Sequence, residues 1–153
     1  MKKTFQIRAI SATETQPVRH RVLWPQLPNS EACVSDGDDD AHHVGAFDNQ
    51  GQLVGVCSLF KQRSTRFPDA IDPHAFLYRL RTMGTLEEVR GQGAAASIIE
   101  YVCQWCRGQG AEFIWCDARE VAYGFYEHMG FTFHSEEFAI ENIGLHRMMT
   151  RSL

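Results

Sequence analysis

The sequence predicts a mixed α+β and α/β fold, in which helices flank a central mixed sheet and the elements follow the order β-α-β-β-β-α-β-α-β-β. Three observations carry this prediction. Short apolar or alternating stretches are bounded by Gly, Pro, Asn and Asp, which is typical of strands. Apolar residues recur at three- and four-residue spacing between Gly93 and Gly108, which predicts an amphipathic helix. A strand, a helix and a strand follow one another over residues 76–117, so we expect a crossover connection and a parallel strand pair.

The first predicted elements are a strand and a helix. Residues 5–10 alternate well enough for a strand, and Ser11 is placed to cap a helix over residues 13–23. Pro17 lies awkwardly inside that helix, because proline lacks the backbone donor. An acidic loop, residues 36–40, follows.

A hairpin comes next. Residues 43–47 and 52–60 have strand character and flank the turn at 48–51, where a glycine is available for a positive φ. Residues 61–75 contain two prolines and are expected to form a loop. The next strand is expected over residues 76–83.

The amphipathic helix that begins after Gly93 is expected to end at Gly108 and Gly110. No internal repeat or linker is visible, so we expect one domain over residues 1–153. The remaining expected elements are a strand over 112–117, a helix over 121–129, and strands over 131–138 and 146–150.

Composition and charge exclude several classes of protein. The chain is 44% hydrophobic and 22% charged, with a net charge of -4 at pH 7, which argues against a nucleic-acid binder that depends on a basic field. The basic run at residues 19–21 is expected to lie on a solvated face. No stretch approaches the ~20 apolar residues of a membrane span, and no apolar signal region follows Lys2 and Lys3. We therefore expect a cytoplasmic protein without membrane contact.

The run Arg90-Gly91-Gln92-Gly93-Ala94-Ala95 lies between a predicted strand and the clearest predicted helix. Backbone N–H groups at a helix start have no partner within the helix, and the helix dipole adds partial positive charge there. Small residues let an anion approach this backbone, so the run suits a pyrophosphate. It matches neither a Walker loop nor Gly-x-Gly-x-x-Gly. Taken alone, the run also fits a strand-to-helix turn without a ligand.

Two motifs together resemble those of the GNAT superfamily of acyl-CoA-dependent N-acyltransferases. Arg90-x-x-Gly93-x-Ala95 resembles the family's Gln/Arg-x-x-Gly-x-Gly/Ala, and residues 122–131 resemble its Ala-x-x-Phe-Tyr-x-x-x-Gly-Phe. The resemblance covers residues 76–133, and the predicted strand order agrees over nearly the whole chain. Two positions depart from the family pattern: Arg119 stands where asparagine is frequent, and Glu87 where proline is frequent.

This resemblance implies an N-acetyltransferase that uses acetyl-CoA as co-substrate, without a metal, and a primary amine of a small molecule or peptide as acceptor. A homodimer is one assembly to expect, and nucleic acid is not an expected partner. The cofactor would lie between two splayed parallel strands, with its pantetheine arm paired to backbone like an added strand. The implied cofactor-binding residues are Met83, Gly84, Thr85, Arg90, Gly91, Gln92, Gly93, Ala94 and Ala95.

Tyr126 is the residue to which the resemblance assigns chemistry, as the group that protonates the departing thiolate. An ordinary thiol has a pKa of ~8.5 and tyrosine ~10, so this transfer is feasible but not strongly downhill. The structural alternative is an aromatic anchor for the short helix. The base that deprotonates the amine stays open among Glu87, Glu88, His42, His43, Asp117 and His134.

Other signals point to weaker hypotheses. Asp36-x-Asp38-x-Asp40 begins like a calcium loop but lacks the required glycine and glutamate, so a solvated loop or an acidic lip that attracts an amine is expected. Cys103 and Cys106 form a C-x-x-C inside a helix, which favours core packing over redox chemistry. Three rivals to acetyl transfer remain: the same fold with another acyl-CoA, a CoA-binding sensor or interaction module without turnover, and a thiol redox protein.

Overall fold

The computed structural model describes residues 3–153 and divides into two compact units. The first unit comprises the described residues up to Phe60 together with Leu80–Val102, and the second comprises Lys61–Arg79 together with Cys103–Leu153. Strand β4 (Leu77–Thr85) and helix α2 (Ala94–Gly108) each contribute residues to both units.

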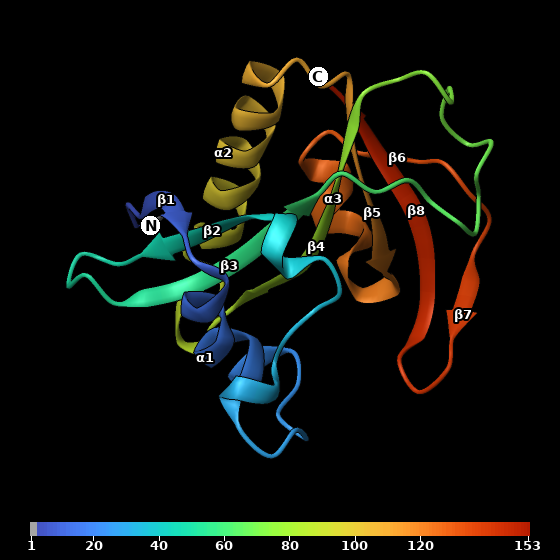
Figure 1. Ribbon diagram of the computed structural model, residues 1–153. Coiled ribbons are helices and arrows are strands. Elements are labelled where there is room, and N and C mark those ends of the chain that lie inside the picture. The colour runs from blue at the N-terminus through green and yellow to red at the C-terminus, as the bar shows by residue number, and fades with distance from the viewer. Residues whose placement is uncertain (1–2) are drawn as a thin grey trace. The chain divides into compact units, whose positions relative to one another are not determined.

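The eight strands form a mixed sheet (Figure 1). Its strand order is β1-β2-β3-β4 in the first unit and β4-β5-β8-β6 in the second, where β7 also pairs with β8. Strands β4 and β5 are parallel, and β5 is antiparallel to β8. The other strands are β1 (Gln6–Ile10), β2 (His42–Phe47), β3 (Leu53–Phe60), β5 (Phe113–Arg119), β6 (Thr132–Phe133), β7 (Phe138–Ile140) and β8 (Gly144–Ser152). The other helices are α1 (Ala12–Val22) and α3 (Tyr123–His128), with 3-10 turns η1 (Ser30–Ala32), η2 (Asp38–Asp40), η3 (Glu87–Val89) and η4 (Glu120–Ala122).

Local sequence explains how the first unit begins. Ser11 caps α1 by accepting a hydrogen bond from the Glu14 backbone, and Glu14 accepts one from the Ser11 backbone in return. Pro17 is accommodated inside the helix. The β2–β3 turn is closed by the Asp48 side chain, and Gly51 adopts a φ of +77° there.

Helices α1 and α2 cover opposite faces of the sheet in the first unit. A methyl group added at Gly55 of β3 would lie 3.1 Å from Ile98 of α2 and 3.1 Å from Thr85 of β4, so Thr85 faces α2. Successive strand residues point to opposite faces, and Gly84 therefore faces α1. An added methyl group at Gly84 would indeed come within 3.0 Å of Val22 on α1.

The second unit has its own apolar core around Trp115, which packs with Ile71, Leu77 and Met148. The indole N–H of Trp115 donates to the backbone carbonyl of Gln62 over 2.9 Å. This contact and the apolar packing fasten the long β3–β4 loop to the sheet.

One arginine organises the end of that loop. The Arg63 guanidinium donates to the carbonyl oxygens of Ala75, Ile71 and Asp72 over 2.9, 3.3 and 2.6 Å. The loop has no helix or strand of its own, so these bonds take the place of secondary structure.

The predicted fold class is confirmed, including the parallel pair β4–β5. One expected element is wrong: residues 131–138 form two short strands rather than one. Between them, the Ser135 hydroxyl accepts from the Met148 backbone N–H over 2.9 Å, and the Ser135 carbonyl accepts from Arg147 over 3.0 Å. These side-chain bonds replace ladder bonds and interrupt the strand, which an apolar count over the segment does not reveal.

Candidate active site

The run between β4 and α2 has the geometry of an anion site. Gly91 and Gly93 adopt φ of +78° and +94°, which glycine reaches without steric cost. The Ser97 N–H donates to the Gly93 carbonyl over 3.0 Å and begins the helix. The N–H groups of Ala94 and Ala95 therefore precede the first bond of the α2 ladder, at the positive end of the helix dipole.

Neighbouring segments hold this loop in place. The Gln92 side chain donates to the Glu88 carbonyl over 3.1 Å, and the Lys3 backbone N–H donates to the Gln92 carbonyl over 3.0 Å. Arg21 of α1 forms an exposed ion pair with Glu88 at 3.2 Å. A hydrogen bond from its own backbone, together with the Arg21 guanidinium, lowers the pKa of the Glu88 carboxyl. Arg90 is exposed beside the loop.

The other expected cofactor-binding residues end β4. Gly84 is buried against α1, whereas Met83 and Thr85 are half-buried. The strand ends where the Leu86 N–H donates to the Val54 carbonyl over 2.8 Å. The first unit thus contains all nine residues expected to bind the cofactor, on β4 and on the turn that follows it.

Tyr126 belongs to the second unit, on helix α3. Its ring packs edge-on against Phe125 and Phe131, at centroid distances of 5.3 and 5.2 Å. Its hydroxyl forms a hydrogen bond with the thiol of Cys116 on β5, and the side chain is 9% exposed. Tyr126 therefore combines an anchoring ring with a hydroxyl directed at a sulfur atom.

The six candidate bases differ in how they are engaged. Both ring nitrogens of His43 are hydrogen-bonded, Nδ1 to Ser58 at 2.6 Å and Nε2 to the Asp38 carbonyl at 2.8 Å. Asp117 pairs with Arg79 at 3.0 Å, and His134 Nδ1 bonds Thr150 at 2.9 Å.

Burial lowers the pKa of His42, and neighbouring His43 lowers it further, which favours the neutral imidazole. Glu87 is exposed on η3, and Glu88 is engaged by Arg21. These contacts leave the choice of base open.

A buried arginine was missed by the sequence reasoning. Arg19, expected on a solvated face, is 0% exposed. Its guanidinium donates to both carboxylate oxygens of Asp38 over 2.7 and 3.0 Å, and to Ser58 over 3.1 Å. The available signal was helical spacing, since Thr15, Val18 and Arg19 occupy the one buried stripe of α1.

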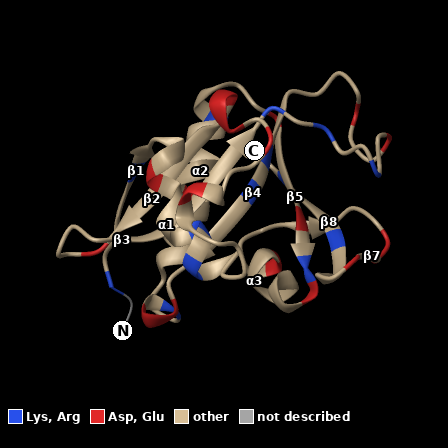
Figure 2. Ribbon diagram, turned by 60° about the horizontal axis from the view of Figure 1, so that its bottom comes forward, with Lys and Arg blue, Asp and Glu red and all other residues tan. Residues whose placement is uncertain are grey.

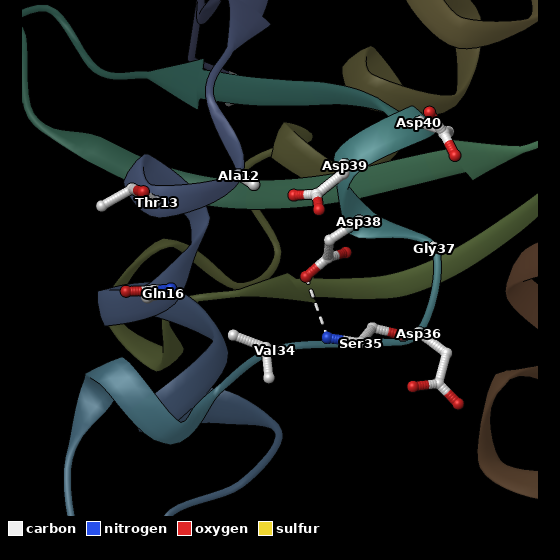
Figure 3. Close-up of a pocket in the computed structure, with 10 residues that line it drawn as sticks. All are labelled: Ala12, Thr13, Gln16, Val34, Ser35, Asp36, Gly37, Asp38, Asp39 and Asp40. Carbon is white, nitrogen blue, oxygen red and sulfur yellow. Dashed lines mark hydrogen bonds between the residues drawn. The ribbon is translucent and has the colours of Figure 1, made fainter.

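The acidic loop lines a pocket of about 590 Å³ beside the start of α1 (Figure 3). Asp38 turns toward the Ser35 backbone N–H, 2.8 Å away, while Asp36 and Asp40 point in other directions (Figure 3). Asp36, Asp39 and Asp40 are exposed. Elsewhere, acidic and basic residues are interspersed along both units (Figure 2).

The remaining sequence signals have structural outcomes. All five cysteines are buried thiols without a disulfide, and Cys103 and Cys106 lie within α2. Burial, with the neighbouring Cys103, raises the pKa of Cys106 to about 12, which disfavours a reactive thiolate. Within residues 3–153 no group of three or more His, Cys, Asp or Glu side chains is arranged to hold a metal. No helix in the same range has the length and apolar character needed to cross a membrane.

A parallel strand pair joined by a helix with a glycine-rich start is the arrangement that the resemblance to the GNAT acyltransferases predicts. Comparisons with known proteins agree. The model of the acetyltransferase (GNAT) family matches residues 6–131, and the chain belongs to that family.

Individual relatives extend the match to nearly the full length. The chain is 31% identical over 151 residues to the uncharacterized N-acetyltransferase YitI of Bacillus subtilis (strain 168), covering 97% of each chain. Among solved structures it is similar to Escherichia coli ElaA, with a TM-score of 0.72, 16% identity, and coverage of 97% and 99%. It is also similar to an aminoglycoside 6'-N-acetyltransferase complexed with coenzyme A, with a TM-score of 0.72, 14% identity, and 96% of each chain covered. The protein is an acyltransferase of the N-acetyltransferase class.

Proposed function

We propose that the chain, residues 1–153, acts as one N-acetyltransferase domain that moves an acetyl group from acetyl-CoA to a primary amine of a small molecule or peptide. The observation that carries this proposal is the turn at the start of α2. There, two left-handed glycines precede backbone N–H groups that lack partners within the helix. The coenzyme A in the complex of the similar aminoglycoside acetyltransferase supports the choice of donor.

The roles follow the chemistry of thioester aminolysis. In the proposal, Arg90, Gly91, Gln92, Gly93, Ala94 and Ala95 hold the pyrophosphate, and the backbone of Met83, Gly84 and Thr85 pairs with the pantetheine arm. The neutral amine attacks the carbonyl carbon, a C–N bond forms, and the C–S bond breaks. The sulfur leaves as a thiolate that takes a proton from Tyr126, while a base removes the proton from the amine nitrogen.

The charge of the acidic loop favours the proposal that the acceptor is a cationic amine. Asp36, Asp39 and Asp40 are exposed, so their negative charge is available to attract an ammonium group before it loses its proton. Asp38 is excluded from this role, because Arg19 neutralises it.

Calorimetric titration with acetyl-CoA tests the donor. Ligand at 100 times its Kd should add about 2.7 kcal/mol to the free energy of unfolding, visible as a thermal shift. Gly93→Glu should abolish binding, because a side chain and a negative charge enter the loop. Gly110→Glu is the matched control at the other end of α2, with a similar φ of +89° and no atom within 4 Å of the added carbon. A wild type that does not respond to acetyl-CoA or CoA would refute the proposal.

Turnover separates an enzyme from a binding module. Release of the CoA thiol can be followed with a disulfide reagent against a panel of amines, since the protein's own thiols are buried. Acetyl-CoA binding without turnover on any amine would favour the CoA-binding sensor or interaction module. Faster turnover with a longer acyl-CoA would favour an acyltransferase of the same fold that uses another donor.

A further inference from the structure

Thr82, within β4, has a backbone conformation that its side chain disfavours. Its φ is +52°, and Asn142 is the other non-glycine residue with positive φ in the described range 3–153. Asparagine tolerates this region, whereas a β-branched residue such as threonine is an outlier there. Such a conformation persists only where surrounding contacts impose it.

Helix α1 supplies a contact to the Thr82 side chain. The Thr82 hydroxyl accepts a hydrogen bond from Arg19 Nη2 over 3.3 Å and donates to the Arg81 carbonyl over 2.8 Å. Threonine offers one hydroxyl hydrogen and lone pairs for acceptance, so both bonds form together. Arg19 is fully buried and cannot exchange this bond for one with water.

Arg19 is itself fixed by other groups of the first unit. Its Nη1 donates to the Cys33 carbonyl over 3.2 Å and to Asp38 over 2.7 Å. Its Nη2 has two hydrogens for three acceptors, Asp38 at 3.0 Å, Ser58 at 3.1 Å and Thr82 at 3.3 Å, so one of these hydrogens is shared between two acceptors. Bidentate pairing with a carboxylate sets the plane of a guanidinium as well as its position. These bonds therefore fix where Arg19 Nη2 lies relative to the Thr82 hydroxyl.

His43 completes the network and sets the direction of its hydrogen bonds. A carbonyl only accepts, so His43 Nε2 donates to the Asp38 carbonyl. In the neutral ring His43 Nδ1 then accepts from the Ser58 hydroxyl, 2.6 Å away, and leaves the Ser58 oxygen to accept from Arg19. The loop that carries Asp38, strand β3 and helix α1 are thus joined to one residue of β4.

The residues that follow Thr82 are Met83, Gly84 and Thr85, and α1 also supports Gly84 through Val22. We propose that Arg19 is a positioning residue for strand β4. It holds Thr82 in the left-handed conformation and so fixes the backbone of residues 83–85, with which the pantetheine arm pairs. This inference rests on the proposed function. Arg19 does not touch the cofactor and acts through Thr82.

Substitutions at Thr82 distinguish this role from simple packing. Thr82→Val keeps the branched shape but loses the hydroxyl, so nothing supports the positive φ, and the Kd for CoA should rise about tenfold or more. Thr82→Gly adopts the same φ without support and should keep the Kd within about threefold of the wild type. Packing alone predicts the opposite order, because glycine removes more atoms than valine does.

The decisive test is rescue in a double variant. Arg19→Lys keeps a positive charge but loses the planar fork that reaches Asp38 and Thr82 together, so its Kd for CoA should rise as it does in Thr82→Val. Arg19→Lys combined with Thr82→Gly should restore affinity to near that of Thr82→Gly, while the melting temperature stays low. Backbone chemical shifts and coupling constants of residue 82 report φ directly in each variant.

The outcomes separate this inference from the function on which it rests. A wild type that does not bind CoA overturns the proposed function and this inference with it. A wild type that binds, with equal Kd values for the Val and Gly variants, overturns the positioning role alone. Should Arg19→Lys fail to fold, the comparison of Thr82→Val with Thr82→Gly decides the question, and a valine variant with wild-type affinity refutes the inference.

Discussion

Replacement of a left-handed glycine by alanine should act differently at two matched positions of the first unit. Gly91, in the loop before α2, and Gly51, in the β2–β3 turn, have φ of +78° and +77°. At neither position would an added methyl group meet another atom within 4 Å. The two substitutions therefore introduce the same conformational strain, about 1–2 kcal/mol, without a clash at either site.

The strain should appear in different measurements. Gly51 closes a hairpin whose strands hold it in place, so Gly51→Ala should lower the free energy of unfolding by about 1 kcal/mol and leave the Kd for CoA unchanged. Gly91 is exposed in a loop that can relax when no ligand is bound. CoA binding must then restore the left-handed conformation, so Gly91→Ala should raise the Kd by about 5–30-fold, with little loss of stability.

Calorimetry with CoA gives the Kd of each variant, and chemical unfolding gives the free energy of unfolding of each. The reasoning fails if Gly91→Ala binds CoA as tightly as the wild type. It fails equally if both variants lose the same affinity, since Gly51 lies in the β2–β3 turn and is not among the residues proposed to bind the cofactor.

Three further predictions concern single side chains. Tyr126→Phe should keep CoA affinity and lower kcat by about 10²-fold, the lower end of the range for general acid help, and unchanged kcat would reduce Tyr126 to a packing residue. Cys106, whose pKa is raised to about 12, should react with a disulfide reagent only as fast as the protein opens, and rapid native labelling at pH 7 would reopen the redox alternative. The pKa of Asp38 is lowered because hydrogen bonds from Arg19 and Ser35 outweigh its desolvation, so its stabilising contribution should be present above about pH 4 and be lost as the pH falls further. Asp38→Asn should cost about 3–5 kcal/mol at pH 7, because Arg19 stays buried without its counter-charge, and the difference from wild type should shrink below pH 4 in acid unfolding curves.

The fold was predictable because its local signals agree with its tertiary contacts. Ser11 caps α1 as its place before the predicted helix indicates, and the apolar positions Ile98, Ile99 and Val102 of α2 are buried. The segment 131–138 was not predictable in the same way. Its interruption depends on hydrogen bonds that Ser135 accepts from Arg147 and Met148 of β8, and such long-range partners leave no periodic pattern in the sequence.

The candidate site likewise contains residues that local sequence predicts and a residue that depends on long-range contacts. Glycines before a predicted helix indicate positions where a positive φ is possible. Gly91 and Gly93 have the positive φ that an anion-binding loop requires. The sequence gives no comparable signal for Arg19, since an arginine in a basic run is usually solvated. Only the position of Asp38, 19 residues later in the chain, makes its burial favourable.

The hydrogen bonds of Arg63 have a consequence for how the β3–β4 loop can evolve. One guanidinium engages the main-chain oxygens of three residues there, and main-chain oxygens are present whatever side chain is attached. The path of this segment thus depends on Arg63, on the Trp115 contact and on the apolar packing more than on most of the exposed side chains between Arg66 and His74. We expect substitutions at most of these exposed positions to leave the register of Leu77 with Phe113 unchanged as long as Arg63 is retained.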